Sequence, residues 1–271
     1  MKIFAGPWVG EFGWELFCWQ GYLRQLAFKL KQNDSQSEFI VSCRPGHEVL
    51  YEDFATRFDL YSPPSEETTE WKNKSDPDPG LPLHHFQGKW VSPNKVRLTW
   101  SPMNEKFKNQ NFKIFGRPNR CPSMVLIHAR STDKYDTGYR NYPREGWGRI
   151  IDRIHSQHGA IVANIGSTSQ SMRCHQADLD LRGIALWQLA DYMANAICVI
   201  GPSSGPIHLA SLCACPHLTW SGDRGNKRRY EEVWNPFNTP CAYVSDSWRP
   251  EVSQLIKEID IFIDRARTEK L

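Results

Sequence analysis

The uninterrupted apolar run over residues 123–128 (SMVLIH) constrains the fold more than any other segment of the chain. Strands that are covered by helices on both faces read as continuous hydrophobic runs, as in parallel sheets, whereas half-exposed strands alternate. Segments of helical periodicity separate this run from further strand-like runs at residues 2–5, 38–43, 160–165, 196–200 and 216–220. Strands that alternate with helices predict an α/β fold with mainly parallel sheets.

Apolar residues at helical spacing predict the connecting helices. One apolar face recurs every three or four residues from Leu16 to Leu30, and residues 47–58 form a second amphipathic segment. Pro143 suits the first turn of another helix. Further helices are predicted at residues 186–195, from the 201–206 loop through residue 214, and from residue 250 past residue 262.

The length of 271 residues favours two compact halves, because a domain usually takes roughly 100–200 residues. We predict an N-terminal α/β domain over residues 1–118, a second α/β domain over 119–249 and a C-terminal helix over 250–271. Each half has a glycine-containing loop after a strand, which suggests a cleft between two Rossmann-like domains. Residues 63–82 are polar and rich in proline, so we expect an irregular segment there.

Charge and hydropathy bound the class of protein. A net charge of +3 is too small to indicate a polyanionic partner, although a locally basic face is compatible with it. The sequence has no run of about 18 apolar residues, and its start, MKIFAGP, lacks the apolar stretch of a secretory signal. We therefore expect a soluble cytoplasmic protein without a transmembrane segment, and the sequence leaves its oligomeric state open.

Neither the cysteines nor the acidic pairs predict a metal site. The eight cysteines contain no CxxC pair, and Cys213–Cys215 has no nearby histidine pair to complete a zinc site, so we expect buried free thiols. The letters DxD at Asp76–Asp78 and Asp178–Asp180 are similar to metal-bound nucleotide sites of other sugar-transferring enzymes. Because neither pair follows a clear buried strand, we predict no metal and no cofactor.

The first candidate site follows the 123–128 run. Ligands of open α/β sheets bind at the carboxyl ends of strands, and Arg130 and Asp133 lie directly after this strand. The guanidinium of Arg130 suits bidentate contacts to a diphosphate and neutralises charge on a leaving group. The alternative is an ordinary turn, in which Asp133 is solvated and Arg130 pairs with a carboxylate.

The second candidate site is the loop between a strand and a helix at residues 200–210 (IGPSSGPIHLA). Small residues let the backbone approach an anion, and the helix start adds free N–H donors. Ser203, Ser204 and Gly205 supply these features, while His208 faces either the ligand or the core. The loop matches neither the P-loop nor GxGxxG, and its structural alternative is an N-cap without a ligand.

Two further segments carry charged groups. Glu11 lies in the first post-strand loop with Gly10, Phe12 and Gly13, where a carboxylate suits a general base for an acceptor hydroxyl; the alternative is an acid placed at a helix start. Residues 223–229 (DRGNKRR) include Arg228 and Arg229, which would bind phosphates or would lie in a solvated loop.

These segments resemble two enzyme families. His128-Ala-Arg130-Ser-Thr-Asp133-Lys134, followed by Tyr-Pro143, resembles the HxRxTDK donor motif of α1,6-fucosyltransferases. Residues 186–210 are similar to the donor domain of heptosyltransferases, where G-x-[DS]-S-G-x-x-H-L-A closes on the diphosphate. The resemblance covers roughly residues 124–220, and Pro202 stands where a polar residue is usual.

The resemblance implies a GT-B glycosyltransferase, with two Rossmann-like domains and most often an inverting, metal-independent reaction. Its implied donor residues are Arg130, Asp133, Ser203, Ser204, Gly205 and His208, and we expect Arg228 or Arg229 of the basic run to add a further phosphate contact. Glu11 matches the acidic base of the heptosyltransferase first loop. The expected partners are a nucleotide-sugar donor and an acceptor, which is a glycan, a lipid-linked saccharide or a hydroxymethylated DNA base. The alternatives are a non-catalytic nucleotide-sugar or nucleic-acid binding module and a GT-B-like nucleotide-sugar epimerase.

Overall fold

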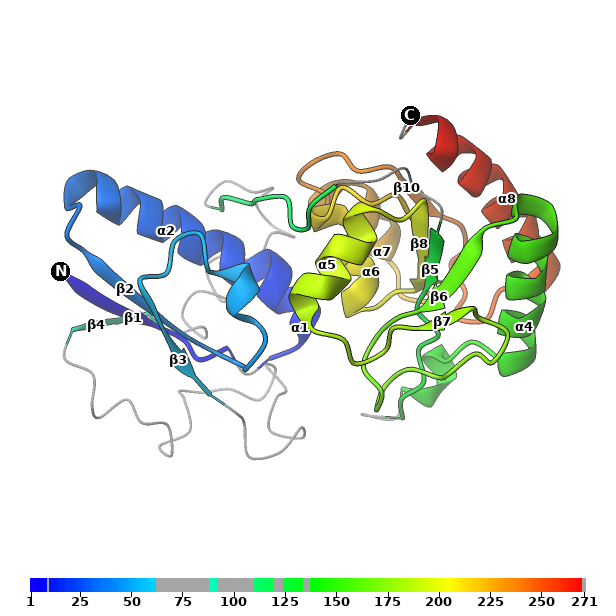
Figure 1. Cartoon of the computed structure of the whole chain (residues 1–271), viewed down its shortest axis with the longest axis horizontal. Coiled ribbons are helices and arrows are strands. Elements are labelled where there is room, and N and C mark those ends of the chain that lie inside the picture. Colours follow the sequence, from blue (N-terminus) through cyan, green and yellow to red (C-terminus); the bar gives the residue numbers. More distant parts are fainter. Residues whose placement is uncertain (9, 62–87, 92–109, 119–123, 134–136, 270–271) are drawn as a thin grey trace. The chain divides into compact units, whose positions relative to one another are not determined.

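The computed structural model describes residues 1–8, 10–61, 88–91, 110–118, 124–133 and 137–269 (Figure 1). The chain divides into two compact units, Met1–Lys113 and Ile114–Leu271. The whole proline-rich segment at 63–82, with Asp76 and Asp78, lies outside the described residues. No helix in the described part of the chain is long and apolar enough to cross a membrane.

The first unit contains a four-stranded, wholly parallel sheet with the order β3-β2-β1-β4. Its strands are β1 (Lys2–Ala5), β2 (Glu38–Cys43), β3 (Arg57–Leu60) and β4 (Lys89–Val91). The helical crossover from β1 to β2 begins with α1 (Phe12–Trp14), continues through a π-helical turn at Glu15–Trp19 and ends with α2 (Gln20–Asn33). Of the predicted apolar face of this crossover, Leu16, Trp19 and Leu23 are fully buried, while Leu26 and Leu30 are half-buried.

The predicted helix at residues 47–58 is wrong. A single 3-10 turn (Glu48–Leu50) is followed by turns and then by β3. The chain enters the sheet at Thr56, whose N–H donates to the carbonyl of Phe39 at 2.8 Å, while the N–H of Phe39 donates to Oγ1 of Thr56 at 3.0 Å. Pairing with β2 therefore overrides the helical spacing of the apolar residues in this segment.

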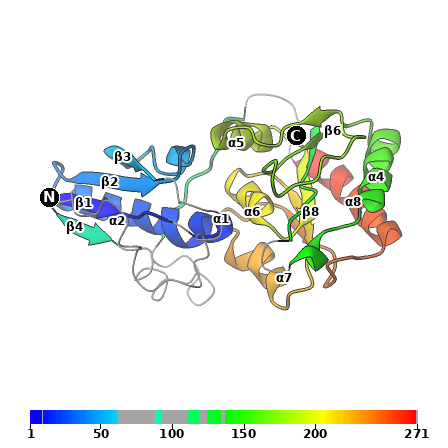
Figure 2. The same cartoon turned by 90° about the horizontal axis from the view of Figure 1, so that it is seen from below.

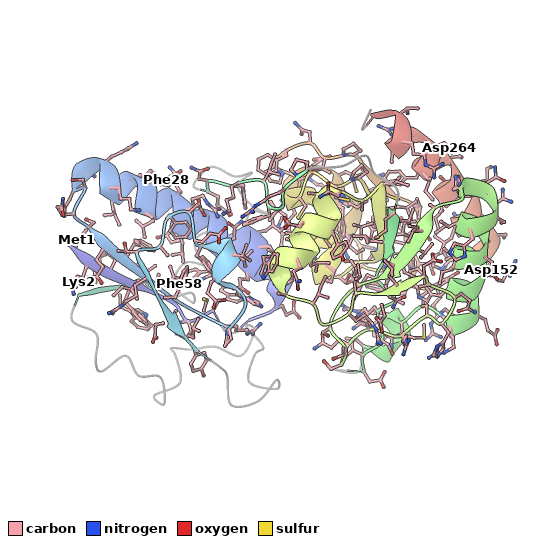
Figure 3. All side chains as sticks on the ribbon, in the orientation of Figure 1. Met1, Lys2, Phe28, Phe58, Asp152 and Asp264 are labelled. Atoms are coloured by element: carbon pink, nitrogen blue, oxygen red, sulfur yellow. The ribbon has the colours of Figure 1, made fainter. Side chains whose placement is uncertain are left out.

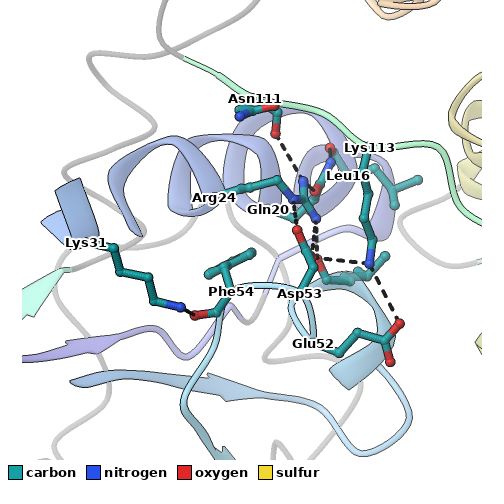
Figure 4. A network of polar contacts seen from close by, with 10 residues as sticks. Leu16, Gln20, Arg24, Lys31, Glu52, Asp53, Phe54, Asn111 and Lys113 are labelled. Atoms are coloured by element: carbon teal, nitrogen blue, oxygen red, sulfur yellow. Dashed lines mark hydrogen bonds and ion pairs between the residues drawn. The ribbon is translucent and has the colours of Figure 1, made fainter. Parts of the chain in front are cut away.

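A buried charge fastens the end of the first unit to its helix (Figure 4). Arg24 is 1% exposed, and its guanidinium donates to both carboxylate oxygens of Asp53, at 2.7 and 3.1 Å. It also donates to the carbonyls of Leu50 and Asn111 and to the side chain of Gln20. Because a buried guanidinium is stable only when its donors are satisfied, these contacts fix residues 110–113 against α2.

The second unit contains a six-stranded, wholly parallel sheet with the order β10-β9-β8-β5-β6-β7. Its strands are β5 (Met124–Ile127), β6 (Ile161–Asn164), β7 (Leu179–Asp180), β8 (Cys198–Pro202), β9 (His217–Trp220) and β10 (Cys241–Tyr243). After β5 the chain builds the sheet in one direction through β6 and β7. It then returns to the other side of β5 with β8, so the strand order reverses between β5 and β8.

Helices cover both faces of this sheet. They are α4 (Arg144–Arg153), α5 (Leu186–Ala194), α6 (Gly205–Leu212), α7 (Asn226–Arg228) and α8 (Val252–Glu269). Helices α4 and α8 lie on one face and α5 and α6 on the other (Figures 1 and 2). Side chains fill both layers, whereas Asp152 of α4 and Asp264 of α8 point outward (Figure 3). Val125, Leu126 and Ile127 are all fully buried, which explains the uninterrupted apolar run.

The predicted fold class, two α/β units with mainly parallel sheets, is confirmed. The seven cysteines in the described part of the chain are free thiols, of which six are buried and Cys241 is half-buried.

Candidate functional site

The carboxyl ends of β5 and β8 form the candidate site. These strands pair in register, with Ile127 opposite Ile200, and the N–H of His128 donates to the carbonyl of Ile200 at 2.9 Å. The two following loops then meet through their side chains, because Nδ1 of His128 lies 2.8 Å from Oγ of Ser204. Open α/β sheets bind ligands where the strand order reverses. A ligand site is therefore expected at this junction between β5 and β8.

His128 is a neutral, tightly enclosed residue at this junction. Burial, with a smaller contribution from the charge of Arg130, lowers the pKa of His128 to about 3. Its Nε2 lies 3.4 Å from Oγ of Ser171, so both ring nitrogens have a hydroxyl neighbour. Gly166 has φ of 115°, and a Cβ there would lie 2.0 Å from Oγ of Ser171 and 2.7 Å from the imidazole. The imidazole therefore sets the orientation of the Ser204 hydroxyl.

The loop of Ser203 and Ser204 between β8 and α6, here called the serine loop, leads into a helix start that no side chain caps. Ser204 is the extended residue before α6, and its hydroxyl contacts His128 instead of capping the helix. The backbone N–H of Ser204 donates to the hydroxyl of Tyr230 at 3.0 Å, and that hydroxyl donates to Oγ of Ser203 at 3.1 Å. The first N–H groups of a helix have no partner within the helix. The first turn of α6, which begins at Gly205, therefore suits an anion.

A second set of contacts ties the loop after β9 to the serine loop. Nδ2 of Asn226 donates to Oγ of Ser221 at 2.6 Å and approaches Oγ of Ser203 at 3.5 Å. The N–H of Asp223 also donates to Ser221, at 3.1 Å. Sequence reasoning missed Ser221, Asn226 and Tyr230. The available signal was the position of Ser221, directly after a predicted strand.

Arg130 is folded onto its own loop. Its Nη1 donates to the carbonyl of Thr137 at 3.1 Å and to Oδ1 of Asn141 at 2.5 Å, and its Nη2 donates to Oγ1 of Thr137 at 2.6 Å. The exposed Asp133 lies beside Gly138, where a Cβ would come within 2.5 Å of its carboxylate. The guanidinium thus organises residues 137–141, and a diphosphate would have to share or replace these contacts.

The remaining donor-side residues have different surroundings. His208 is buried, with its ring stacked on Tyr230 at 4.2 Å and edge-on to Trp234 at 4.5 Å. Burial, followed by the charges of Arg229 and His217, holds the pKa of His208 well below its ordinary value, so the ring is a neutral packing group. Arg229 lies over the ring of Trp234 at 4.9 Å.

Arg228 is exposed on α7, where it pairs with Glu232 at 3.4 Å. Residues 226–228 of the basic run form a helical turn, and a π-helical turn at Arg229–Val233 continues it.

In the first unit, Glu11 is an exposed residue at the start of α1. Its carbonyl accepts from Nε1 of Trp8 at 3.2 Å, and its side chain makes no capping hydrogen bond. The neighbouring carbonyl of Gly10 accepts from Nη2 of Arg44 at 3.0 Å, and Gly13 lies within α1. This loop follows β1, so Glu11 lies at the carboxyl edge of the first sheet.

The acidic pair at 178–180 is committed to partners within the protein. Asp178 accepts from the N–H of Val162 at 2.7 Å and from His155 at 2.8 Å, while both oxygens of Asp180 accept from Arg182. The pKa of each carboxyl lies below its ordinary value, for Asp178 mainly because of the Val162 N–H and for Asp180 mainly because of Arg182. The described residues contain no group of three or more histidine, cysteine, aspartate or glutamate side chains that could hold a metal ion.

Three solved structures share the architecture of this chain. Escherichia coli ADP-heptose lps heptosyltransferase II matches with a TM-score of 0.59 and 9% identity over 97% of this chain and 98% of its own. The glycosyl transferase family 9 protein from Veillonella parvula DSM 2008 matches with a TM-score of 0.60 and 10% identity over 99% and 97%. A putative UDP-N-acetylglucosamine 2-epimerase from Listeria monocytogenes matches with a TM-score of 0.50 and 10% identity over 98% and 89%.

No family model matches the chain, and no curated protein sequence matches it. At identities near 10% the structural likeness establishes the fold alone. The chain therefore has the fold of GT-B glycosyltransferases such as the heptosyltransferases, as the sequence predicted. The resemblance to fucosyltransferases stays a prediction.

Proposed function

We propose that the protein is a glycosyltransferase that transfers a sugar from a nucleoside diphosphate sugar to an acceptor hydroxyl. The observation that carries this proposal is the uncapped start of α6, with the hydroxyls of Ser203 and Ser204, at the point where the strand order of the second sheet reverses. Ligands of such sheets bind at this point, and helix starts favour phosphate. The fold of the heptosyltransferases is consistent with a donor of this chemical class.

In this proposal the diphosphate lies against the first turn of α6. Gly205 has no side chain, so it allows a close approach of the backbone, and Ser203 and Ser204 donate from their hydroxyls. Arg130 contacts the diphosphate directly, exchanging part of its contacts with Thr137 for phosphate oxygens. Asp133 and His208 stay on the donor side as predicted, His208 through its packing beside the loop.

The proposed reaction requires stabilisation of the leaving group and a general base. The diphosphate leaving group must be stabilised, which Arg130, Arg228 or Arg229 and the start of α6 would do without a metal. The acceptor hydroxyl must lose its proton to a base, for which the sequence nominates Glu11, in the loop with Gly10, Phe12 and Gly13. We therefore propose an inverting, metal-independent in-line attack, with a glycan or a hydroxymethylated DNA base as the acceptor.

A nucleotide-sugar epimerase is the second candidate, because an epimerase of this class shares the fold over 98% of the chain. Both activities would use the same diphosphate site, but they differ in products. A transferase that uses water in place of its acceptor releases a free sugar and a nucleoside diphosphate, whereas an epimerase releases an altered sugar. A non-catalytic binding module would bind the nucleotide and release neither.

The test measures nucleotide binding and donor breakdown together. Binding of ADP and UDP is followed by calorimetry, and ADP-heptose and UDP-N-acetylglucosamine are incubated with the protein while the products are separated. Ser204→Ala is expected to weaken nucleotide binding by roughly tenfold, because a hydrogen bond to a charged group contributes about 1.5–3 kcal/mol. The matched control is Ser156→Ala, whose hydroxyl contacts only the carbonyl of Arg153 in the described structure.

Equal affinities in wild type, Ser204→Ala and Ser156→Ala would remove the diphosphate site from this loop. Release of an epimerised sugar would replace the transferase by the second candidate. Nucleotide binding without any donor breakdown would favour the binding module.

A further inference from the structure

A buried carboxylate in the first unit has no place in the proposed donor chemistry. Glu15 is 1% exposed and lies in the π-helical turn that follows α1. One of its oxygens lies 2.8 Å from Nδ1 of His47, and the other accepts from the hydroxyl of Tyr51 at 2.6 Å. Both oxygens are therefore held by side chains that come from the segment after β2.

The charge on Glu15 is maintained in spite of its burial. Burial alone would raise the pKa of Glu15, but His47, Arg44 and Tyr51 together outweigh it, so the pKa lies below its ordinary value. An ionised carboxylate inside a protein is costly unless it is well paired. Buried charges with a specific partner are also frequent at functional sites. Glu15 is thus too enclosed to act as a base itself, but it is well placed to orient His47.

His47 bonds the buried carboxylate on one side and reaches the protein surface on the other. Its side chain is 20% exposed, and its ring contacts Phe12 edge-on at 5.5 Å. Arg44, three residues earlier, donates to the carbonyl of Gly10, so the loop after β2 is joined to the loop that contains Glu11. Strands β1 and β2 are parallel neighbours, which is why their following loops meet at one edge. Nε2 of His47 makes no hydrogen bond with the described residues.

We propose that His47, oriented by Glu15, is the base that removes the proton from the acceptor hydroxyl; this inference rests on the proposed function. In that step the O–H bond of the acceptor breaks and its proton moves to Nε2 of His47. The oxygen forms the new bond to the anomeric carbon, and the bond from that carbon to the diphosphate breaks with its electron pair on the phosphate oxygen. Glu15 is a positioning residue, which holds Nδ1 as the donor and stabilises the imidazolium.

Two properties favour His47 over Glu11 for this step. A base works best when its ordinary titration lies near the working pH, which holds for imidazole and not for a carboxylate. An imidazole whose second nitrogen bonds a buried carboxylate is also fixed in one tautomer, as in the serine-protease triad. Glu11, in contrast, has an exposed side chain that makes no capping bond to fix its direction.

The pH–rate profile can be assigned to this base if the neighbouring groups do not change charge near neutral pH. Glu15 is the carboxylate bonded to the imidazole, and the groups that act electrostatically on Glu15 and on its neighbours Tyr51 and Cys43 are His47, Arg44, Glu48 and Asp59. Burial, with the charge of Glu15 second, raises the pKa of both Cys43 and Tyr51, while the pKa of Glu15 is lowered. None of these three groups therefore changes charge between pH 5 and 9.

The deciding experiment follows hydrolysis of ADP-heptose and UDP-N-acetylglucosamine, with water as the acceptor, from pH 5 to 9. His47→Asn keeps an amide donor near the position of Nδ1 and removes the basic nitrogen. The rate of hydrolysis is expected to fall by roughly 10²-fold or more, since general-base catalysis contributes about 10²–10⁴-fold. The decline of the wild-type rate at low pH, which is the acidic limb of the pH–rate profile, is expected to disappear. The affinity for ADP is expected to stay unchanged, and an unchanged indole N–H resonance of the fully buried Trp19 shows that the first unit of the variant is folded.

Two carboxamide variants separate the roles of the carboxylates. In Glu15→Gln the rate of hydrolysis should fall, because the amide no longer fixes Nδ1 of His47 as the donor, and the neutral ring should lose its preference for one tautomer. A purely structural role of Glu15 would lower the rate without changing the tautomer. Glu11→Gln tests the competing base at the same edge of the sheet, the one that the sequence nominates, and it should keep the limb if His47 is the base.

The opposite pattern, a limb lost in Glu11→Gln and kept in His47→Asn, would overturn the inference and assign the base to Glu11. A wild type that binds neither ADP nor UDP and hydrolyses neither donor would instead refute the proposed function. Nitrogen NMR of the wild-type imidazole gives an independent readout of the tautomer. A neutral ring that carries its proton on Nε2 would overturn the role of His47 whatever the rates show.

Discussion

Lowering the pH from 7 to 5 is expected to destabilise the second unit, because its folded state keeps buried histidines neutral. Burial, with a smaller contribution from Arg130, lowers the pKa of His128 to about 3. Burial lowers the pKa of His217 to about 4, against the opposing hydrogen bond to the carbonyl of Cys215. His208 shifts in the same direction for the same main reason. Protonation of any of these rings requires it to leave the core.

The size of the effect follows from proton linkage. An unfolded histidine titrates near pH 6.5, so below that pH the unfolded chain binds protons that the folded chain does not. The stabilisation is fully present above about pH 6.5 and is lost as the pH falls towards the folded pKa. Each depressed histidine then loses about 1.4 kcal/mol per pH unit, or about 2 kcal/mol by pH 5. His128 and His217 together lose about 4 kcal/mol, a large part of an ordinary domain stability of about 5–15 kcal/mol.

Urea unfolding at pH 7, 6 and 5 measures this loss. The indole N–H resonances of Trp147 and Trp220 report on the core of the second unit, where both rings are fully buried. In His217→Asn the loss of unfolding free energy between pH 7 and 5 should be smaller by about 2 kcal/mol, whatever the variant's stability at pH 7. Equal unfolding free energies of the wild type at pH 7 and pH 5 would refute the argument that these rings are neutral.

Three further outcomes are expected. Arg130→Ala should weaken ADP binding, measured by calorimetry, and speed up hydrogen exchange in residues 137–141. Arg130→Lys should restore little of the ADP affinity, because lysine lacks the forked geometry. Unchanged affinity in a folded Arg130→Ala protein would exclude the diphosphate contact. Donor hydrolysis should survive EDTA, and a loss that Mn²⁺ or Mg²⁺ restores would show a metal requirement. Arg24→Ala should lower the unfolding free energy of the first unit by about 3 kcal/mol, measured by urea unfolding, because Asp53 loses its partner. A loss below about 1 kcal/mol would show that the ion pair between Lys113 and Asp53 replaces this contact.

Local patterns in the sequence were sufficient for most of the framework. A continuous apolar run predicted β5, because a strand covered on both faces needs no alternation. Four strands, β3, β4, β7 and β10, were missed, and none is a continuous buried run. The two residues of β7 are exposed, and the three residues of β10 are all half-buried. Pairing with a neighbouring strand defines these elements, and a single sequence does not display it.

The strand pattern predicted that the loops after β5 and β8 end at one edge of the sheet, but it did not predict their contacts. Parallel strands end at a common edge, so the loops that contain Arg130 and Ser204 could be assigned to one site from the strand pattern. The contact between His128 and Ser204 spans 76 positions, and that between Glu15 and His47 spans 32. Such pairs depend on the strand order, which local periodicity does not encode. The inward turn of Arg130 likewise depends on Thr137 and Asn141, in which the sequence shows no signal.

The contiguity of the two units bears on the order in which the chain gains structure during synthesis. The first unit ends at Lys113, so all of its described strands have been made before the ribosome reaches β5. The second unit behaves differently, because its central strand β5 pairs with β8, and α4 shares its core with α8. Leu255, Ile259 and Phe262 of α8 cover a face that stays open until α8 emerges. A nascent chain therefore presents a finished first unit beside an apolar, incomplete second one, the state in which chaperone binding and aggregation compete.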